Sequence, residues 1–344
     1  MGALKDSLIG RRGHVGGSAR GRWRDVRTCP VCGRSRWCQI SDDGATVLCH
    51  TGGDGEPRES RHGSYFWVHH LEEPAHIERW QPSLRESTVR ADPDTRDRAY
   101  GTLLRKLGLS QTHRAALHAR GFSDEHIARA GYATLPLRGR AAAARAVEEL
   151  CAVSGVPGFV VATGDGDREY RTLAGSPGLL VPARDIEGRV VALKIRRDEV
   201  RGGEPKYVSL SSSHKGGPRA ESALHVPVFA SRERGRELVI TEGELKADAA
   251  SVLTGLDVIS VPGVSSWKLA LPAVKALAPS RVFVAFDADA RTNGDVAHAQ
   301  HQLVAALRRE GVAVGLLTWP MHEGKGLDDY LLNRRQVVGA EVSR

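Results

Sequence analysis

The sequence predicts an α/β protein: a parallel sheet flanked by helices over residues 235–335, preceded by an α+β segment and a small zinc-ribbon-like module. Three observations support this fold class. Four of the five cysteines lie within residues 29–49, a strand-rich stretch with a hairpin signal follows, and short apolar runs alternate with helical runs after residue 235. Alternating strands and helices are typical of a parallel sheet with helices on its faces.

Composition limits the class of protein. The chain has 344 residues, of which 41% are hydrophobic, enough for about two domains with real cores. No apolar run reaches the roughly 18 residues of a membrane span, and the N-terminus lacks a signal-peptide core, so we expect a cytoplasmic protein with no membrane partner. The 49 Lys and Arg exceed the 41 Asp and Glu by eight. This balance is typical of nucleic-acid-binding proteins, although an Arg-rich proteome gives the same excess.

The chain divides by composition into six parts. We expect a disordered basic arm (1–26), a zinc-binding module (27–71), a Pro-containing linker (72–98), a helical and strand-rich segment (99–234), the α/β domain (235–335) and a tail (336–344). No segment matches GxxxxGK[ST], so we expect no ATPase motor within this chain.

The segment before the α/β domain starts with helices. Apolar residues recur at helical spacing over residues 98–133, and Gly108 and Gly121 each interrupt the pattern shortly before a serine that can cap the next helix. An Ala-rich helix is predicted at 141–150. Strands at 179–182 and 190–195 are predicted to form a hairpin with Gly188 at its tip.

The α/β domain is predicted from four apolar runs. Strands are expected at 238–241, 258–261, 282–286 and 312–317, with helices at 244–253 and 267–277 and a third ending at residue 309. A final helix is expected to begin in the segment 325–330.

Four of the five cysteines are crowded into a short segment, in which residues 29–33 read Cys-Pro-Val-Cys-Gly. In a reducing compartment such crowding indicates a metal site rather than disulfides. The tight turn points two thiolates at one ion, and Gly33 relieves backbone strain where the chain doubles back. The favoured ligands of a closed, structural Zn²⁺ site are Cys29, Cys32, Cys38 and Cys49. His50 is the substitute ligand if Cys38 is merely a buried thiol.

The other candidate ligands are expected to be structural. His62, His69 and His70 are predicted to be surface or packing residues, because the four cysteines already complete a site. Cys151 lies beside the apolar face of the helix predicted at 141–150 and is predicted to be a core thiol.

Carboxylates follow two of the predicted parallel strands. Glu242 comes directly after the first strand, and Asp287 and Asp289 come after the third. The carboxyl ends of parallel strands meet at one edge of the sheet, where ligands of α/β proteins bind, and alternate residues of an extended segment face the same way. Three converging carboxylates repel one another unless a cation neutralises them. Oxygen ligands of this kind suit Mg²⁺ or Mn²⁺.

The start of the final helix adds further charges. Lys325 supplies a cation for phosphate, and Asp328 and Asp329 supply two carboxylates that suit a second ion. Each of these features also has an ordinary explanation, since Asp residues after strands cap helices and a Glu-Gly pair makes a turn. Their joint order, each at a predicted strand end, favours a site.

This order resembles the TOPRIM domain of bacterial primases, topoisomerases and some nucleases, whose signature is a Glu after the first strand and Asp-x-Asp after the third. The resemblance implies Mg²⁺-dependent making or breaking of phosphodiester bonds. It assigns catalysis and Mg²⁺ binding to Glu242, Asp287 and Asp289, with Asp328 as a further Mg²⁺ ligand and Lys325 offsetting triphosphate charge. Glu242 is either a ligand or a general base.

Two further stretches resemble a bacterial-type primase core: residues 178–191, and the Pro-Lys-Tyr at 205–207. By this resemblance Lys194, Arg196, Arg197 and Lys206 face the template strand or the incoming nucleotide, although a basic strand edge also discourages aggregation. The order of a zinc module followed by this core resembles primases of bacteria, phages and mobile elements. Stretches like residues 241–248 recur in the mobile-element proteins. This stretch contains Lys246, which is a further nucleotide-binding candidate.

The sequence therefore predicts a small DNA primase that makes short RNA primers on single-stranded DNA from ribonucleoside triphosphates. Since the chain ends soon after the α/β domain, a helicase partner is expected to be a separate protein. The alternatives are a TOPRIM nuclease that cleaves DNA, and a non-catalytic zinc and TOPRIM DNA-binding regulator of replication.

Overall fold

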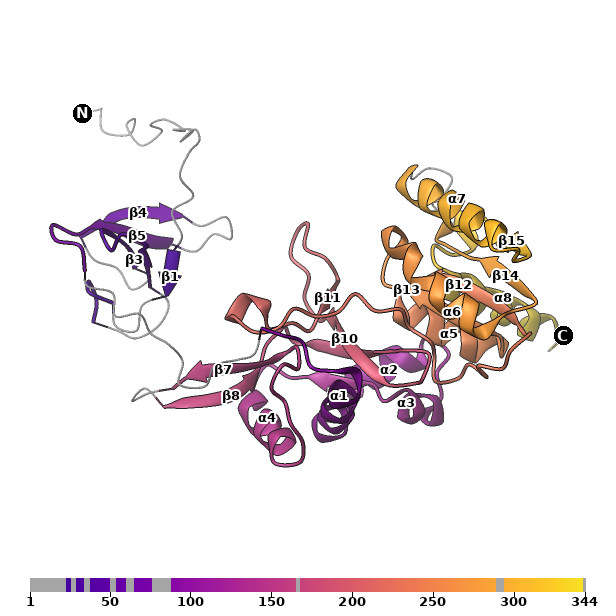
Figure 1. Cartoon of the computed structure of the whole chain (residues 1–344), viewed down its shortest axis with the longest axis horizontal. Coiled ribbons are helices and arrows are strands. Elements are labelled where there is room, and N and C mark those ends of the chain that lie inside the picture. The colour runs from indigo at the N-terminus through magenta and orange to yellow at the C-terminus, as the bar shows by residue number, and fades with distance from the viewer. Residues whose placement is uncertain are drawn as a thin grey trace, which may run out of the picture. The chain divides into compact units, whose positions relative to one another are not determined.

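The computed structural model describes residues 23–25, 29–33, 38–49, 54–59, 65–75, 88–164, 168–288 and 294–342. The chain divides into an N-terminal unit, residues 1–83, and a C-terminal unit, residues 84–344 (Figure 1). Asp289, His50, His62 and most of the basic arm predicted at 1–26 lie outside the described residues. No helix within the described ranges is both long and apolar enough to cross a membrane.

The N-terminal unit is built on a five-stranded antiparallel sheet of order β1-β2-β3-β5-β4. A tight turn at Gly44, with a φ of 74°, joins β2 to β3. Two boundaries differ from the prediction. Strand β1 falls within the predicted disordered arm, and Ala75, beyond the predicted end at residue 71, still packs on the cysteine cluster. The strands are β1 (Trp23–Asp25), β2 (Gln39–Ser41), β3 (Thr46–Cys49), β4 (Glu56–Glu59) and β5 (Tyr65–His70).

The C-terminal unit opens with three helices: α1 (Pro93–Leu107), α2 (Gln111–His118) and α3 (Asp124–Ala130). The predicted breaks and caps are confirmed, since the side chains of Ser110 and Ser123 accept hydrogen bonds at the starts of α2 and α3. The linker predicted at 72–98 ends too late, because Asp92 caps α1 and Pro93 begins it. A proline fits the first helical position because the N–H it lacks has no partner within a helix.

An antiparallel sheet of order β11-β10-β9-β6 follows these helices. The predicted hairpin is confirmed: β9 and β10 pair antiparallel, and Gly188 between them has a φ of 90°. Leu103 of α1 and Leu193 of β10 are fully buried in the core between helix and sheet. The elements are β6 (Ala133–Leu135), α4 (Arg140–Glu148), the β7 (Phe159–Thr163) and β8 (Glu169–Leu173) pair, β9 (Gly178–Arg184), β10 (Val190–Arg197) and β11 (Tyr207–Ser209).

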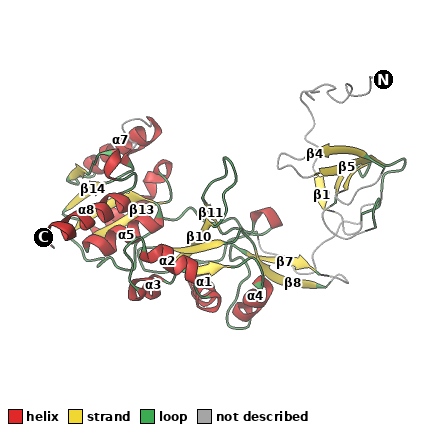
Figure 2. Ribbon diagram, turned by 180° about the vertical axis from the view of Figure 1, so that it is seen from behind, coloured by secondary structure: helices red, strands yellow, loops and turns green. Residues whose placement is uncertain are grey.

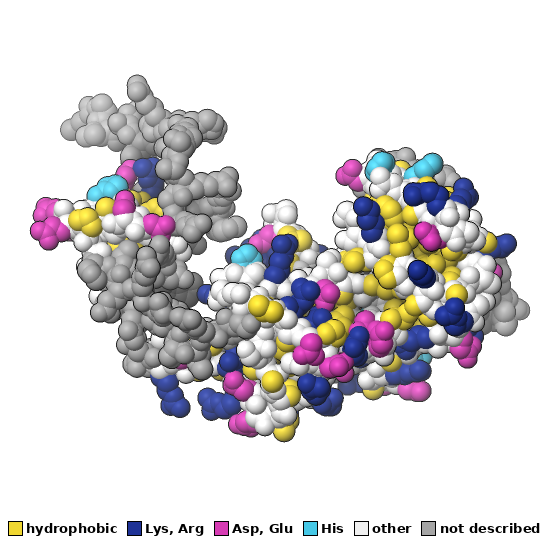
Figure 3. All heavy atoms as spheres, viewed as in Figure 1, with side chains coloured by type: hydrophobic (Ala, Val, Ile, Leu, Met, Phe, Trp, Pro, Cys, Tyr) yellow, Lys and Arg dark blue, Asp and Glu magenta, His cyan; other side chains and the backbone are white. Residues whose placement is uncertain are grey.

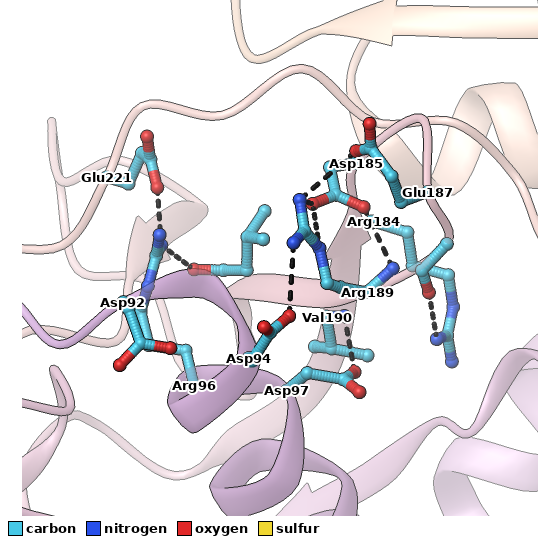
Figure 4. Close-up of polar contacts among 12 residues, drawn as sticks. Asp92, Asp94, Arg96, Asp97, Arg184, Asp185, Glu187, Arg189, Val190 and Glu221 are labelled. Carbon is cyan, nitrogen blue, oxygen red and sulfur yellow. Dashed lines mark hydrogen bonds and ion pairs between the residues drawn. The ribbon is translucent and has the colours of Figure 1, made fainter.

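Polar contacts fix α1 against the hairpin (Figure 4). Arg189, at the start of β10, donates to Asp94 of α1 at 3.0 Å. Asp97 accepts a hydrogen bond of 2.7 Å from the first N–H of β10. Arg96 is almost wholly buried and donates to a carbonyl of β10 at 2.5 Å and to Glu221. These charge-assisted bonds hold the register of β10, the strand that carries three of the predicted basic residues.

A second sheet, all parallel and of order β13-β12-β14-β15, forms the rest of the unit. Helices cover both of its faces (Figure 2). Leu238 and Ile240 of β12 face the core formed with α6 and α7, whereas Val239 faces the core formed with α5 and α8. The elements are β12 (Glu237–Glu242), α5 (Glu244–Thr254), β13 (Asp257–Val261), α6 (Ala270–Leu277), β14 (Arg281–Val284), α7 (Gly294–Arg309), β15 (Val314–Leu316) and α8 (Leu327–Val342).

The predicted parallel sheet is therefore confirmed, with differences at several element ends. The fourth strand, predicted at 312–317, spans only Val314–Leu316. The third strand ends at Val284, two residues before the predicted end at Phe286. The last helix extends to Val342 and so runs through most of the predicted tail at 336–344. Short 3₁₀ helices at Ser213–Lys215, Val264–Leu269 and Met321–Glu323 complete the unit.

A buried polar network joins the antiparallel part to α5. Tyr132 donates to Asp248 at 2.6 Å, and His225 Nε2 lies 3.1 Å from the other carboxylate oxygen. The Nδ1 atom of His225 accepts a backbone N–H at 3.0 Å, so Nε2 carries the proton and donates to Asp248. Burial raises the pKa of Tyr132, which keeps it a donor.

Replacing Asp248 with alanine leaves both of these buried donors without an acceptor. We expect Asp248→Ala to lower the free energy of unfolding of the C-terminal unit by about 3 kcal/mol or more. Urea denaturation measures this loss. Glu310→Ala, an exposed position at the end of α7, is the control and should change stability by less than about 0.5 kcal/mol. A loss below about 1 kcal/mol for Asp248→Ala would contradict a structural role for the network.

Candidate functional site

The N-terminal unit brings the four predicted cysteines together. One sulfur atom from each of Cys29, Cys32, Cys38 and Cys49 lies within 4.8 Å of the other three. The first two flank a turn in which Gly33 N donates to Cys29 O at 2.8 Å, and Gly33 has a φ of 68°. Cys38 immediately precedes β2 and Cys49 ends β3. The β2–β3 hairpin therefore places these two cysteines beside the first two.

This cluster has the donor set of a closed zinc site. Three of the four cysteines are almost wholly buried, and four thiolates complete a tetrahedral shell. Burial raises the pKa of Cys29, so the thiolate that a metal requires forms with the ion rather than before it. The four cysteines can therefore hold Zn²⁺, as the sequence predicts.

Histidines take no part in this cluster among the described residues. His70 is exposed and lies 3.2 Å from the hydroxyl of Thr46, and His69 packs against Gly55. Cys151 is half-buried in the core beside α4, as expected of a core thiol.

The C-terminal unit brings Glu242 and Asp287 together at the carboxyl edge of the parallel sheet. Glu242 is the last residue of β12, and Asp287 follows the neighbouring strand β14. Both carboxylates contact the ammonium of Lys246 on α5, at 3.1 Å from Glu242 Oε1 and in a short ion pair with Asp287. The two carboxylates therefore share one cation, and the predicted convergence of these strand ends is present.

Gly243 makes this arrangement possible. Its φ of 81° turns the chain from β12 into α5, a conformation that other residues adopt only with strain. Lys246 lies in the first turn of α5, from which its ammonium reaches back to Glu242 at the end of β12.

The pKa shifts of Glu242 and Lys246 reflect burial and the sharing of one ammonium by two carboxylates. Burial raises the pKa of Glu242, and the charge of Asp287 adds to the effect while Lys246 opposes it. Burial alone would lower the pKa of Lys246, but the two carboxylates outweigh it and raise that pKa. The lysine therefore stays charged and is the counter-ion of the pair.

Asp328, at the start of α8, is a further buried carboxylate of this region. One of its oxygens, Oδ2, pairs with Arg120 from the turn after α2. The other, Oδ1, is buried and has no hydrogen-bond partner among the described residues. Burial raises the pKa of Asp328, while Arg120 and Lys246 lower it. Asp328 therefore lies within the electrostatic reach of Lys246.

The loop before α8 is held by backbone bonds. Ala288 N donates to the carbonyl of Lys325 at 3.0 Å, and Asp329 accepts from Gly326 N at 3.2 Å. The side chain of Lys325 is exposed. Asp289, the remaining predicted ligand, lies outside the described residues, so its position relative to Asp287 stays a prediction.

Three of the predicted basic residues lie on the antiparallel sheet near this edge. Lys194 and Arg196 alternate along β10 and share one face, with Arg196 opposite Tyr207 of β11. Among the described residues, neither they nor Lys206 form an ion pair, whereas Arg197 points to the other face and pairs with Glu204 at 2.8 Å. The prediction grouped all four basic residues, whereas Arg197 lies on the face of β10 opposite to that of Lys194 and Arg196.

Charge effects indicate how close these groups are. The charge of Arg196 lowers the pKa of Lys206, and burial and Arg120 act in the same direction. Asp329 acts on Lys206 in the opposite sense. Lys206 therefore feels the charges of both the basic strand and the first turn of α8. Figure 3 shows that Lys and Arg side chains are spread over one face of the unit rather than gathered in a single patch.

Sequence reasoning missed two features of this site. Arg120 lies 208 residues from Asp328 along the chain, and no local pattern links the two. Lys246 was predicted to bind nucleotide, whereas its ammonium contacts Glu242 and Asp287. The available signal for that pairing was Gly243, which turns the chain from the strand directly into α5 and so brings the first turn of the helix beside Glu242.

Comparisons with known proteins were made on sequence and on structure. A family model described as "Domain of unknown function (DUF3854)" matches residues 232–337, which include the whole parallel sheet. No curated protein matches the sequence.

Solved structures similar to this chain include bacterial primase domains. The zinc-binding and RNA polymerase domains of the Aquifex aeolicus primase match with a TM-score of 0.54 and 16% identity, over 73% of this chain and 62% of that one. The RNA polymerase domain of Mycobacterium tuberculosis primase DnaG matches with a TM-score of 0.53 and 15% identity, over 72% of this chain and 84% of that one. A DnaG catalytic core matches with a TM-score of 0.51 and 18% identity, over 72% of this chain and 78% of that one.

These likenesses show the fold. The chain has the mixed α/β architecture of a primase core, with a parallel sheet and helices. It spans less than two thirds of the Aquifex aeolicus structure.

Proposed function

We propose that the chain is a DNA primase-like nucleotidyltransferase that synthesises short RNA primers on single-stranded DNA at a TOPRIM-type acidic site. The observation that carries the proposal is the meeting of Glu242 and Asp287 on one ammonium at the carboxyl edge of a parallel sheet. The primase-like fold supports it. The basic residues Lys194, Arg196 and Lys206 nearby supply the charge that a nucleic-acid backbone requires.

The acidic edge is chemically suited to Mg²⁺ or Mn²⁺. Its donors are carboxylate oxygens, and a cation already lies between two of them. Within the part of the chain that the structure describes, Asp328 Oδ1 is buried without a hydrogen-bond partner. Hard divalent cations take such ligands. In this proposal Glu242, Asp287 and Asp289 hold the ion, and Asp328 stays a predicted further ligand.

A divalent ion held there would neutralise triphosphate charge and favour attack by a primer 3′-hydroxyl. The protein's own residues have three tasks in the proposal. Lys206 and Arg196 bind phosphate oxygens of the template or nucleotide. Arg120 holds Asp328, which fixes the first turn of α8 beside the reacting phosphates. The exposed Lys325 adds positive charge for the triphosphate.

The N-terminal unit has a separate part in the proposal. Its zinc site, with four protein ligands, has no open position for substrate and so is structural. The unit is proposed to help hold the template. A separate helicase partner, a mobile-element origin and a cytoplasmic location stay predictions.

The test is primer synthesis by the purified full chain. The protein is incubated with single-stranded DNA, Mg²⁺ and labelled ribonucleoside triphosphates, and products are separated on a denaturing gel. We expect labelled products of a few to some tens of nucleotides that require both template and Mg²⁺.

Parallel reactions with end-labelled DNA and no nucleotides serve as the comparison. Cleavage of that DNA without primer synthesis would contradict the proposal in favour of a nuclease. DNA binding with neither reaction would leave a non-catalytic DNA-binding protein.

A further inference from the structure

The contacts of Lys246 go beyond those of a nucleotide-binding lysine. Its ammonium lies between Glu242 and Asp287, where the proposed function requires a divalent ion. The side chain is about three-quarters buried, at 26% exposure, so the ion pair is protected from much of the solvent screening that weakens surface pairs. A divalent ion and this ammonium cannot occupy the same space between the two carboxylates.

A second acceptor for the lysine lies beside it. Asp328 is 95% buried, and its Oδ1 has no hydrogen-bond partner among the described residues. A methyl group placed on Gly326 would lie 2.6 Å from that oxygen and 3.2 Å from Lys246 Cε. The lysine side chain and this oxygen therefore both lie next to the bare backbone of Gly326.

We infer that Lys246 is a two-position lysine: it neutralises Glu242 and Asp287 in the metal-free protein, and moves to Asp328 Oδ1 when a divalent ion binds. The inference rests on the proposed function and deepens it, because it assigns how that site admits its ion. It makes Lys246 a positioning residue, and it makes Asp328 act on the ion through the lysine rather than by direct ligation.

The movement has energetic consequences in both states. Without metal, the lysine relieves the repulsion between two buried carboxylates. With metal, it satisfies a buried oxygen that otherwise costs free energy. Removing the lysine removes the competition for the site. Removing the charge of Asp328 removes the alternative position, so the lysine is harder to displace.

Mn²⁺ binding to the zinc-loaded full chain tests this without reference to activity. The free-ion signal in electron paramagnetic resonance is titrated for wild type, Lys246→Met, Asp328→Asn and the double variant. Glu242→Gln, alone and beside Lys246→Met, is titrated as well and reports whether binding depends on Glu242. We expect Lys246→Met to bind Mn²⁺ about tenfold more tightly than wild type, within the usual range of coupling between sites. We expect Asp328→Asn to weaken binding about tenfold in the wild-type background and by less than about twofold beside Lys246→Met.

Lys275→Met is the matched control, since it removes the charge of an exposed lysine on α6. It should leave Mn²⁺ affinity within about twofold of wild type. Thermal unfolding of each variant verifies that it is folded. Equal tightening by both Lys→Met variants would reduce the effect to net charge and overturn the inference.

The possible outcomes distinguish failure of the two-position lysine from failure of the proposed function. Unchanged or weaker Mn²⁺ binding by Lys246→Met, with binding that still depends on Glu242, refutes the two-position lysine alone. An equal loss from Asp328→Asn in both backgrounds makes Asp328 a direct ligand and also refutes it. Absence of Glu242-dependent Mn²⁺ binding in every variant would contradict both the inference and the proposed metal site.

Discussion

Primer synthesis is expected to fall at least a thousandfold when Glu242→Gln and Asp287→Asn are combined. Each amide keeps the shape of its carboxyl group, so packing at the sheet edge is retained while two negative charges are lost. The substituted edge no longer attracts a divalent ion, and groups that stabilise charge in a transition state commonly contribute factors of 10²–10³ each. Initial rates with labelled ribonucleotides and single-stranded DNA measure the effect.

Glu237→Gln provides the matched control. It makes the same chemical change at an exposed residue that begins β12, the strand that Glu242 ends. The control should retain activity within about twofold of wild type. Both proteins should keep similar thermal unfolding. A double variant that retains more than about a tenth of wild-type activity would remove these carboxylates from the reaction.

Zinc removal is expected to unfold the N-terminal unit and leave the C-terminal unit folded. The buried cluster described for that unit consists of Cys29, Cys38, Ile40, Val47 and Cys49. Three of its five members are therefore proposed metal ligands. The remaining apolar side chains, Ile40 and Val47 with the partly buried Val31, Leu71 and Ala75, are too few to stabilise a fold of this size. In such small units the free energy of metal binding supplies the free energy of folding.

Hydrogen exchange followed by mass spectrometry resolves the two units. After treatment with a strong zinc chelator, peptides from residues 38–49 and 65–75 should lose their protection, while those of the parallel sheet should keep it. Metal analysis should find one zinc per chain, lost in Cys49→Ser and retained in Cys151→Ser. Protection that survives chelation in the first group would mean that the metal is not what holds this unit together.

Local structure was largely predictable because its signals are local. The caps at Ser110 and Ser123 each lie two residues after a helix-breaking glycine, and Gly188 supplies the positive φ of the hairpin turn. The parallel strands were found from apolar runs of the length typical of strands buried on both faces. The errors concern element ends. Pro93 was assigned to a linker although proline is also a common first residue of a helix.

The candidate site was predictable only in part. The position of Glu242 and Asp287 at strand ends follows from the sequence, since all strands of a parallel sheet end at the same edge. Arg197 was grouped with Arg196 because both are basic, yet adjacent residues of a strand face opposite sides. Arg197 accordingly pairs with Glu204 instead.

The sequence by itself determined which carboxylates and thiols are available and at which ends of which elements they lie, because turns, caps and apolar periodicity depend on neighbouring residues. Only the tertiary structure decided the partners of those charges. Packing of α2 and α3 against α5 brings Arg120 to Asp328, and packing of β12 beside β14 lets Lys246 reach two carboxylates at once. These contacts depend on distances between elements far apart in the chain, and no spacing within a single segment encodes them.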